Sequence, residues 1–107
     1  MAIIGSRSCR GIDIGRFIDM KPSEIVSGGA AGADYYAREY ALKHDIPLRE
    51  FLPEYQKYGK TAPLIRNIKI VENCDCLIAF WNGKSRGTKF TLDLAIRNGK
   101  PFKVVRI

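Results

Sequence analysis

Short apolar runs alternate along this chain with longer segments in which apolar residues recur every three or four positions. The short runs are bounded by glycine, proline or asparagine, which is typical of buried β-strands. We expect five strands, at about Ala2–Ile4, Glu24–Val26, Leu48–Leu52, Leu77–Trp81 and Phe102–Ile107. The longer segments have the period of amphipathic helices, so the two patterns together predict an α/β protein.

Four helices are expected between the strands, over about Ile12–Met20, Ala33–His44, Pro63–Cys74 and Thr88–Gly99. Pro63 suits a first helical turn, where its missing N–H has no partner to lose. Thr88 has a hydroxyl that could cap the last helix, and Gly99 is a typical helix stop. Gly15 interrupts the first helical pattern, which makes that helix the weakest of the four.

Strands that alternate with helices at these lengths imply right-handed βαβ units and therefore a parallel sheet with helices on both faces. We predict one Rossmann-like domain over residues 1–107, with five parallel strands in the order 3-2-1-4-5. In such a sheet a crevice lies between the first and fourth strands, just outside their carboxyl ends. A ligand site is therefore expected there.

The chain carries a net charge of +7, from 18 Lys and Arg against 11 Asp and Glu, which favours an anionic partner. No apolar run approaches the length of a membrane span and no signal peptide is evident, so we expect a cytoplasmic protein without membrane contact. No cluster of residues has metal-ligand spacing, and neither a metal nor a cofactor is expected.

Three cysteines, an odd number without metal or redox spacing, are expected to be reduced thiols. Cys76 opens an apolar run and should lie in the core. Cys9 lies in a polar stretch beside Arg7 and Arg10, whose charges would lower the pKa of its thiol.

Glycine and small polar residues gather in three loops that follow strands: "GSRSCRG" from Gly5, "SGGAAGAD" from Ser27 and "NGKSRGT" from Asn82. Each loop leads to a helix N-terminus, where free amides and the helix dipole favour an anion. Glycine would let the backbone approach a phosphate, but it would equally let a helix and a strand pack closely. The residues alone leave both readings open.

Two familiar nucleotide motifs fail on spacing. "GKS" and "GKT" resemble the end of a P-loop, but the glycine required five residues earlier is Ile78 in one case and Glu54 in the other. "GGAAG" is not a dinucleotide fingerprint, because only Gly29 and Gly32 keep the correct separation. Dehydrogenase chemistry therefore has little support.

Asp34 is expected in a first helical turn, where its carboxylate would repel a phosphate bound at the same turn. It could complement the helix dipole or accept a hydrogen bond from a ribose hydroxyl. Arg66 and Asn67 fall near the start of the third helix, where an exposed face would also explain them. His44, the single histidine, lies at a helix end and is not expected to be a general base.

Taken together, the segments "IIGSR", "VSGGAAGAD", "RN", "DCLIAFWNGKSRGT" and "LAIRNGKP" resemble the SLOG superfamily, which groups the DprA and LOG proteins. The likeness spans nearly the whole chain, keeps the motif order and is greatest to the small YspA- or YpsA-related branch. It implies a nucleotide-binding pocket and a homo-oligomer, at least a dimer. The ligand-binding residues expected from it are Gly5, Ser6, Arg7, Ser27, Gly28, Gly29, Asp34, Arg66, Asn67, Gly87 and Thr88.

We therefore predict a binding module that senses or sequesters a nucleotide or a nucleotide-derived signal, ADP-ribose-like or cyclic. A first alternative is a LOG-like N-glycosidase that uses Arg66 with Asp34 or Asp93. The LOG motif, however, has a glutamate where this chain has Thr91, and an oxocarbenium-like transition state needs a carboxylate. A second alternative is DprA-like binding of single-stranded DNA, for which Tyr55 and Tyr58 are the few candidate stacking residues. These two tyrosines could equally cover the pocket or a subunit contact.

Overall fold

The computed structural model describes residues 1–107. Its five strands form one sheet, in which every strand is parallel to its neighbours. The strands are β1 (Ala2–Gly5), β2 (Ile25–Ser27), β3 (Leu48–Glu50), β4 (Leu77–Trp81) and β5 (Phe102–Arg106). Their order across the sheet is β3-β2-β1-β4-β5, as the sequence predicts. The winding of the chain reverses between β1, the middle strand, and its neighbour β4, so their carboxyl ends form the topological switch point.

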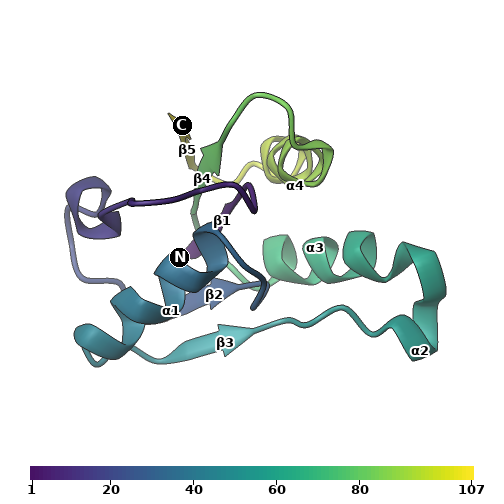
Figure 1. Ribbon diagram of the computed structural model, residues 1–107, viewed down its shortest axis with the longest axis horizontal. Helices are drawn as coiled ribbons and strands as arrows, with labels where there is room; N and C mark the ends of the chain where they lie inside the picture. The colour runs from purple at the N-terminus through teal and green to yellow at the C-terminus, as the bar shows by residue number, and fades with distance from the viewer.

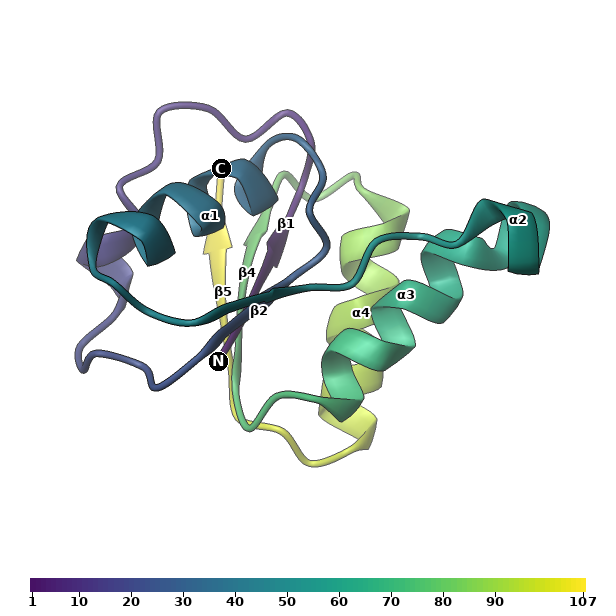
Figure 2. The ribbon, with the colours of Figure 1, turned by 90° about the horizontal axis from the view of Figure 1, so that it is seen from below.

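Helices cover both faces of the sheet, as Figure 2 shows for α1 (Ala33–Lys43) on one side and for α3 (Ala62–Glu72) and α4 (Arg86–Arg97) on the other. Two separate cores result from this layering. Phe80, which is fully buried, lies in the core beneath α1 and stacks edge to face on Phe17 at 5.5 Å. The other core joins α3 and α4 to the opposite face of the sheet through residues such as Ile70 and Leu92.

The first predicted helix is wrong in extent: Ile12–Met20 contains a single 3₁₀ turn, Ile14–Phe17. Gly15 stands inside it, and the carboxylate of Asp13 accepts a hydrogen bond from the Gly15 N–H at 3.2 Å. This local bond replaces the helical ladder that a longer helix would need. Ile18 then returns to extended backbone and ends the turn.

A one-turn helix that the sequence pattern does not predict, α2 (Tyr55–Tyr58), stands away from the sheet at the end of the segment that follows β3 (Figure 1). A short 3₁₀ turn, Gly59–Thr61, joins it to α3. The main contacts of α2 are with this turn and with α3. As a result, α2 forms a projecting arm beside the start of α3.

The predicted cap of the last helix is also wrong, because α4 begins at Arg86 and its N-cap is Ser85. The Ser85 Oγ accepts a hydrogen bond from the Thr88 N–H at 3.3 Å. Thr88 therefore lies inside the first turn rather than before it. Gly99 does end the helix as predicted, with a φ of +69°.

The cysteine environments are the reverse of those predicted. Cys9 is fully buried against the α1 face of the sheet, whereas Cys76 is partly exposed. Burial raises the pKa of the Cys9 thiol and outweighs the opposite effect of Arg10. Cys9 is consequently a core residue. None of the helices has the length and apolar character that spanning a membrane requires.

Candidate functional site

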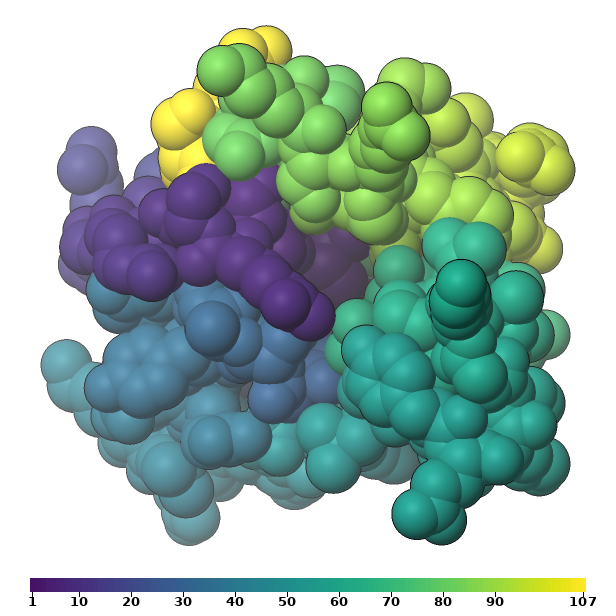
Figure 3. Space-filling view, turned by 45° about the vertical axis from the view of Figure 1, so that its right-hand side comes forward, coloured from purple at the N-terminus to yellow at the C-terminus, as the bar shows by residue number.

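A cavity of about 420 Å³ lies at the carboxyl ends of β1, β2 and β4, where the strand order predicts a crevice. Figure 3 shows it as a hollow between the loop after β1, the start of α4 and α3. Only three of its 17 lining residues are hydrophobic. Its volume is within the range of roughly 300–1,000 Å³ that is usual for ligand pockets, but its lining is far more polar than most of them.

The start of α4 forms one wall of the cavity and leaves backbone donors free. The amide of Thr88 donates to Ser85, and the hydroxyls of these two residues are 3.0 Å apart. The amides of Arg86 and Gly87 have no hydrogen-bond acceptor in the structure. Of the two residues only Gly87 lines the cavity, so its N–H, at the positive end of the helix dipole, is the backbone donor that α4 offers there.

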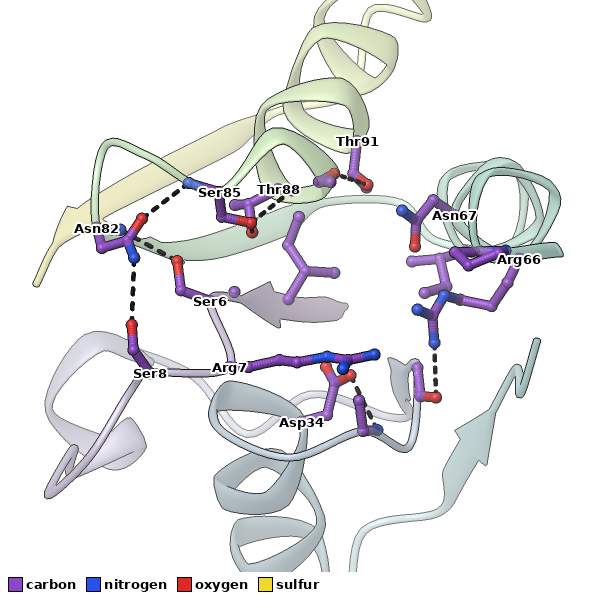
Figure 4. A pocket seen from close by; sticks show the side chains of 17 residues that line it. Ser6, Arg7, Ser8, Asp34, Arg66, Asn67, Asn82, Ser85, Thr88 and Thr91 are labelled. Atoms are coloured by element: carbon purple, nitrogen blue, oxygen red, sulfur yellow. Dashed lines mark hydrogen bonds between the residues drawn. The ribbon is translucent and has the colours of Figure 1, made fainter. Parts of the chain in front are cut away.

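Asn82 fastens the loop after β1 to the loop after β4 (Figure 4). Its backbone N–H donates to the Ser6 Oγ at 3.2 Å, and its side-chain Nδ2 donates to the Ser8 Oγ at 3.2 Å. The Asn82 Oδ1 accepts from the amides of Lys84 and Ser85, at 2.8 and 2.9 Å. One asparagine thus sets the relative position of two cavity walls.

The glycines of the loop after β2 have two different roles: some allow close packing, and one borders the cavity. Gly29 and Gly32 have positive φ, and a Cβ on Gly32 would meet the backbone of Ser6 and Arg7. A Cβ on Gly28, by contrast, would point at the Arg66 guanidinium and at the Asp34 carboxylate, 2.9 Å away. Packing explains Gly29 and Gly32, whereas Gly28 borders the cavity.

Asp34 fastens the same glycine loop, a role that sequence reasoning did not consider. Its Oδ2 accepts a hydrogen bond from the Ala30 N–H at 3.1 Å, and the residue is 9% exposed. Burial raises the pKa of Asp34, while the Ala30 N–H and the charge of Arg66 act in the opposite direction. Asp34 is the only carboxylate that lines the cavity.

Two arginines reach the cavity from opposite sides. Arg66 donates from Nη1 to the Gly28 carbonyl at 2.8 Å, and its buried Nε has no partner. Arg7 extends above Asp34 toward Arg66 (Figure 4) and makes no ion pair. Burial lowers the pKa of Arg66; Asp34 and Tyr55 raise it, and the charge of Arg7 lowers it further. The two guanidinium groups therefore repel each other across the space that an anion would occupy.

The cavity gathers most of the site residues predicted from the sequence. Those that line it are Gly5, Ser6, Arg7, Gly28, Asp34, Arg66, Asn67, Gly87 and Thr88. Ser27 and Gly29 do not line it: Ser27 is fully buried, and its hydroxyl lies 3.4 Å from the Gly29 amide that donates to it. That the lining residues bind a nucleotide stays a prediction.

Four polar lining residues were not predicted, namely Ser8, Asn82, Ser85 and Thr91. Three of them lie inside the loops already singled out, so their position after a strand was the available signal. Thr91 is 2% exposed and its hydroxyl donates to the Gly87 carbonyl at 2.8 Å. Asp93, the other candidate acid, pairs with Lys89 at 3.0 Å and does not line the cavity.

Comparison with protein-family models, with curated proteins and with solved structures finds no match to this chain. The resemblance to the SLOG superfamily therefore stays a prediction from the motifs.

Replacing Asp34 with asparagine tests the effect of burying this carboxylate. The pKa of Asp34 is raised in the folded protein, so as pH increases this carboxyl ionises first in the unfolded chain. The wild type therefore loses stability between the ordinary aspartate pKa of about 3.9 and the raised value. The amide oxygen of the introduced asparagine can still accept from Ala30, but the side chain does not ionise. We expect the difference in unfolding free energy, Asp34→Asn minus wild type, to increase with pH across that window in urea titrations.

The control for this experiment is Glu72→Gln, which removes an exposed carboxylate of α3 that makes no hydrogen bond or ion pair. As a surface substitution that removes no contact, it should change the free energy of unfolding by less than about 0.5 kcal/mol. A flat difference for Asp34→Asn would show that the carboxylate is better solvated than its position implies.

Proposed function

We propose that this chain is a binding module for a phosphate-bearing nucleotide or nucleotide derivative, held in the cavity at the carboxyl ends of β1, β2 and β4. The observation that carries the proposal is the concentration of unpaired positive groups there. Arg7, Arg66 and the free amide of Gly87 face the same space. Asp34 supplies one negative charge against them.

The arrangement suits a phosphate group for two physical reasons. Guanidinium and backbone N–H groups are the donors that bind phosphate oxygens most strongly, and here they converge from three separate segments of the chain. The Asn82 bonds hold the loops after β1 and β4 together before any ligand arrives, which reduces the entropy lost on binding. Neither feature is required by the packing of the sheet.

The proposal is tested by thermal denaturation with inorganic phosphate, ribose 5-phosphate and the four nucleoside 5′-monophosphates. A ligand at about a thousandfold its dissociation constant should stabilise the fold by roughly 4 kcal/mol, or several degrees in Tm. Mass spectrometry of small molecules released from the denatured protein should identify a natural ligand. Absence of any phosphate-dependent shift across the panel would refute the proposal.

Gly87→Ala separates binding from stability. A Cβ at Gly87 would meet no atom closer than the Asn67 Nδ2 at 3.9 Å, so the fold does not need glycine there. Alanine in a helix is about 0.5–1 kcal/mol more favourable than glycine, and the Tm of the free protein should rise by about 2–6 °C. The added methyl lies inside the cavity, and the affinity for ribose 5-phosphate should fall about tenfold, the equivalent of roughly 1.4 kcal/mol, in calorimetric titrations. An unchanged affinity in this more stable variant would place the phosphate elsewhere.

A second candidate function, hydrolysis of an N-glycosidic bond, is favoured by one observation. Asp34 is a carboxyl group that faces the cavity, and its raised pKa is the direction required of a general acid. Steady release of free base from a nucleoside monophosphate, lost in Asp34→Asn, would support this activity. Binding without turnover would leave the chain a binding module.

A further inference from the structure

The chemistry of the cavity lining fits a sugar phosphate better than a nucleobase. None of the lining residues is aromatic, and the two large apolar side chains among them are Ile4 and Ile70. Purines and pyrimidines are usually held between apolar or aromatic faces. The cavity instead presents hydroxyls, amides, a carboxylate and two guanidinium groups.

Asp34 and Asn67 are suited to sugar hydroxyls. The Asp34 carboxylate can only accept hydrogen bonds, and one bond, from Ala30, leaves further acceptor capacity on its two oxygens. The Asn67 side chain lines the cavity and makes no hydrogen bond within the protein. Acceptors of this kind select a ligand that carries hydroxyl donors beside its phosphate, as a ribose does.

An exposed aromatic ring lies just outside the cavity, on the projecting arm formed by α2. Tyr55 is 55% exposed, and Glu54, the residue before it, pairs with Lys69 of α3 at 3.0 Å, one turn along that helix from Arg66. The chain leading to the arm passes the glycine loop, because a Cβ on Gly29 would touch the Leu52 side chain at 2.5 Å. Tyr55 therefore lies beside α3, the helix whose Arg66 forms one wall of the cavity.

We propose that the cavity encloses the ribose and phosphate of the nucleotide, while the base lies outside it against the ring of Tyr55. This inference rests on the nucleotide-binding function proposed above. It adds which part of the nucleotide lies in the cavity and which part lies on Tyr55. Stacking on an aromatic ring accepts every base, because every base has a π-face. The protein consequently binds nucleotides through their ribose phosphate, with little selectivity among bases.

The experiment measures dissociation constants by isothermal titration for ribose 5-phosphate and for adenosine, guanosine, cytidine and uridine 5′-monophosphates. In the wild type, the four nucleotides should differ by less than about tenfold, and ribose 5-phosphate should bind about tenfold more weakly than adenosine 5′-monophosphate. Tyr55→Ala should weaken binding of the adenosine nucleotide about tenfold and leave that of ribose 5-phosphate unchanged. Tyr35→Ala, which removes a comparably exposed tyrosine from α1 outside the cavity lining, should change neither.

Three results would overturn the inference while leaving nucleotide binding intact: strong preference for one base, nucleotide binding without binding of ribose 5-phosphate, or equal loss of both ligands in Tyr55→Ala. If none of these compounds binds, the proposed function itself fails. Circular dichroism of each variant checks that it remains folded. Tyr55 is exposed and α2 contains no buried residue, so its replacement should leave the sheet intact.

Discussion

Replacing Gly32 with alanine is expected to lower the free energy of unfolding by about 4 kcal/mol, a large part of the roughly 5–15 kcal/mol typical of small domains. Gly32 precedes α1 with φ +75° and ψ −128°, a conformation that residues with a side chain rarely adopt. Its Cβ would also meet the Ser6 carbonyl and come within 2.7 Å of the Arg7 Cα. The backbone strain and the clash with the β1 loop act together.

Gly59 provides a matched control for the Gly32 substitution. Its backbone, at φ +58° and ψ −133°, is nearly the same, but no atom lies within 4 Å of its would-be Cβ. Gly59→Ala should therefore show the backbone strain alone, about 2 kcal/mol. Urea unfolding followed by circular dichroism measures both. Equal losses in the two variants would mean that the α1 loop is not tightly packed on the β1 loop.

Arg66→Gln is expected to raise the dissociation constant for adenosine 5′-monophosphate about 30- to 100-fold, the equivalent of about 2–3 kcal/mol. Arg66 supplies both a charge and a guanidinium held in place by the Gly28 carbonyl at 2.8 Å. Glutamine is too short and uncharged, so the phosphate loses a charge-assisted bond and the Gly28 carbonyl loses its donor. Calorimetric titration gives the change directly.

The control for Arg66→Gln is Arg97→Gln, at the end of α4 away from the cavity, which removes the same charge from an exposed position. It should change affinity by less than about twofold at physiological ionic strength, because distant surface charges are screened. A similar loss in both variants would mean that binding depends on net charge. The cavity would then not be the site of recognition.

Much of this architecture can be predicted from patterns in the sequence. Fully apolar runs such as Leu77–Trp81 occur because β4 is covered on both faces, and the handedness of βαβ units then limits the possible strand orders. Loops at the carboxyl ends of parallel strands meet at one edge of the sheet. The convergence of Ser6, Gly28 and Gly87 could for this reason be predicted without coordinates.

The remaining features depend on contacts between distant segments. Four residues of α2 are too few to show a helical period, and Cys9 is buried only because α1 and the sheet close over a locally polar stretch. Glycine at position 87 favours a loop in the sequence analysis, although Gly87 lies within the first turn of α4. The role of Asn82 depends on partners such as Ser6, 76 positions earlier.

The position of β1 in the sheet has a consequence for how the chain folds. Ala2 pairs with Leu77, Ile3 with Ile78 and Ile4 with Ala79, so during synthesis β1 waits for a neighbour that comes 75 positions later. Loop closure over such a distance is slow, and in a nascent chain one edge of β1 remains open to wrong partners until β4 emerges. Because residues of β1 and of the loop after β4 both line the cavity, the cavity is incomplete until β4 has paired with β1. Competence to bind should therefore appear in a single late step, together with completion of the sheet.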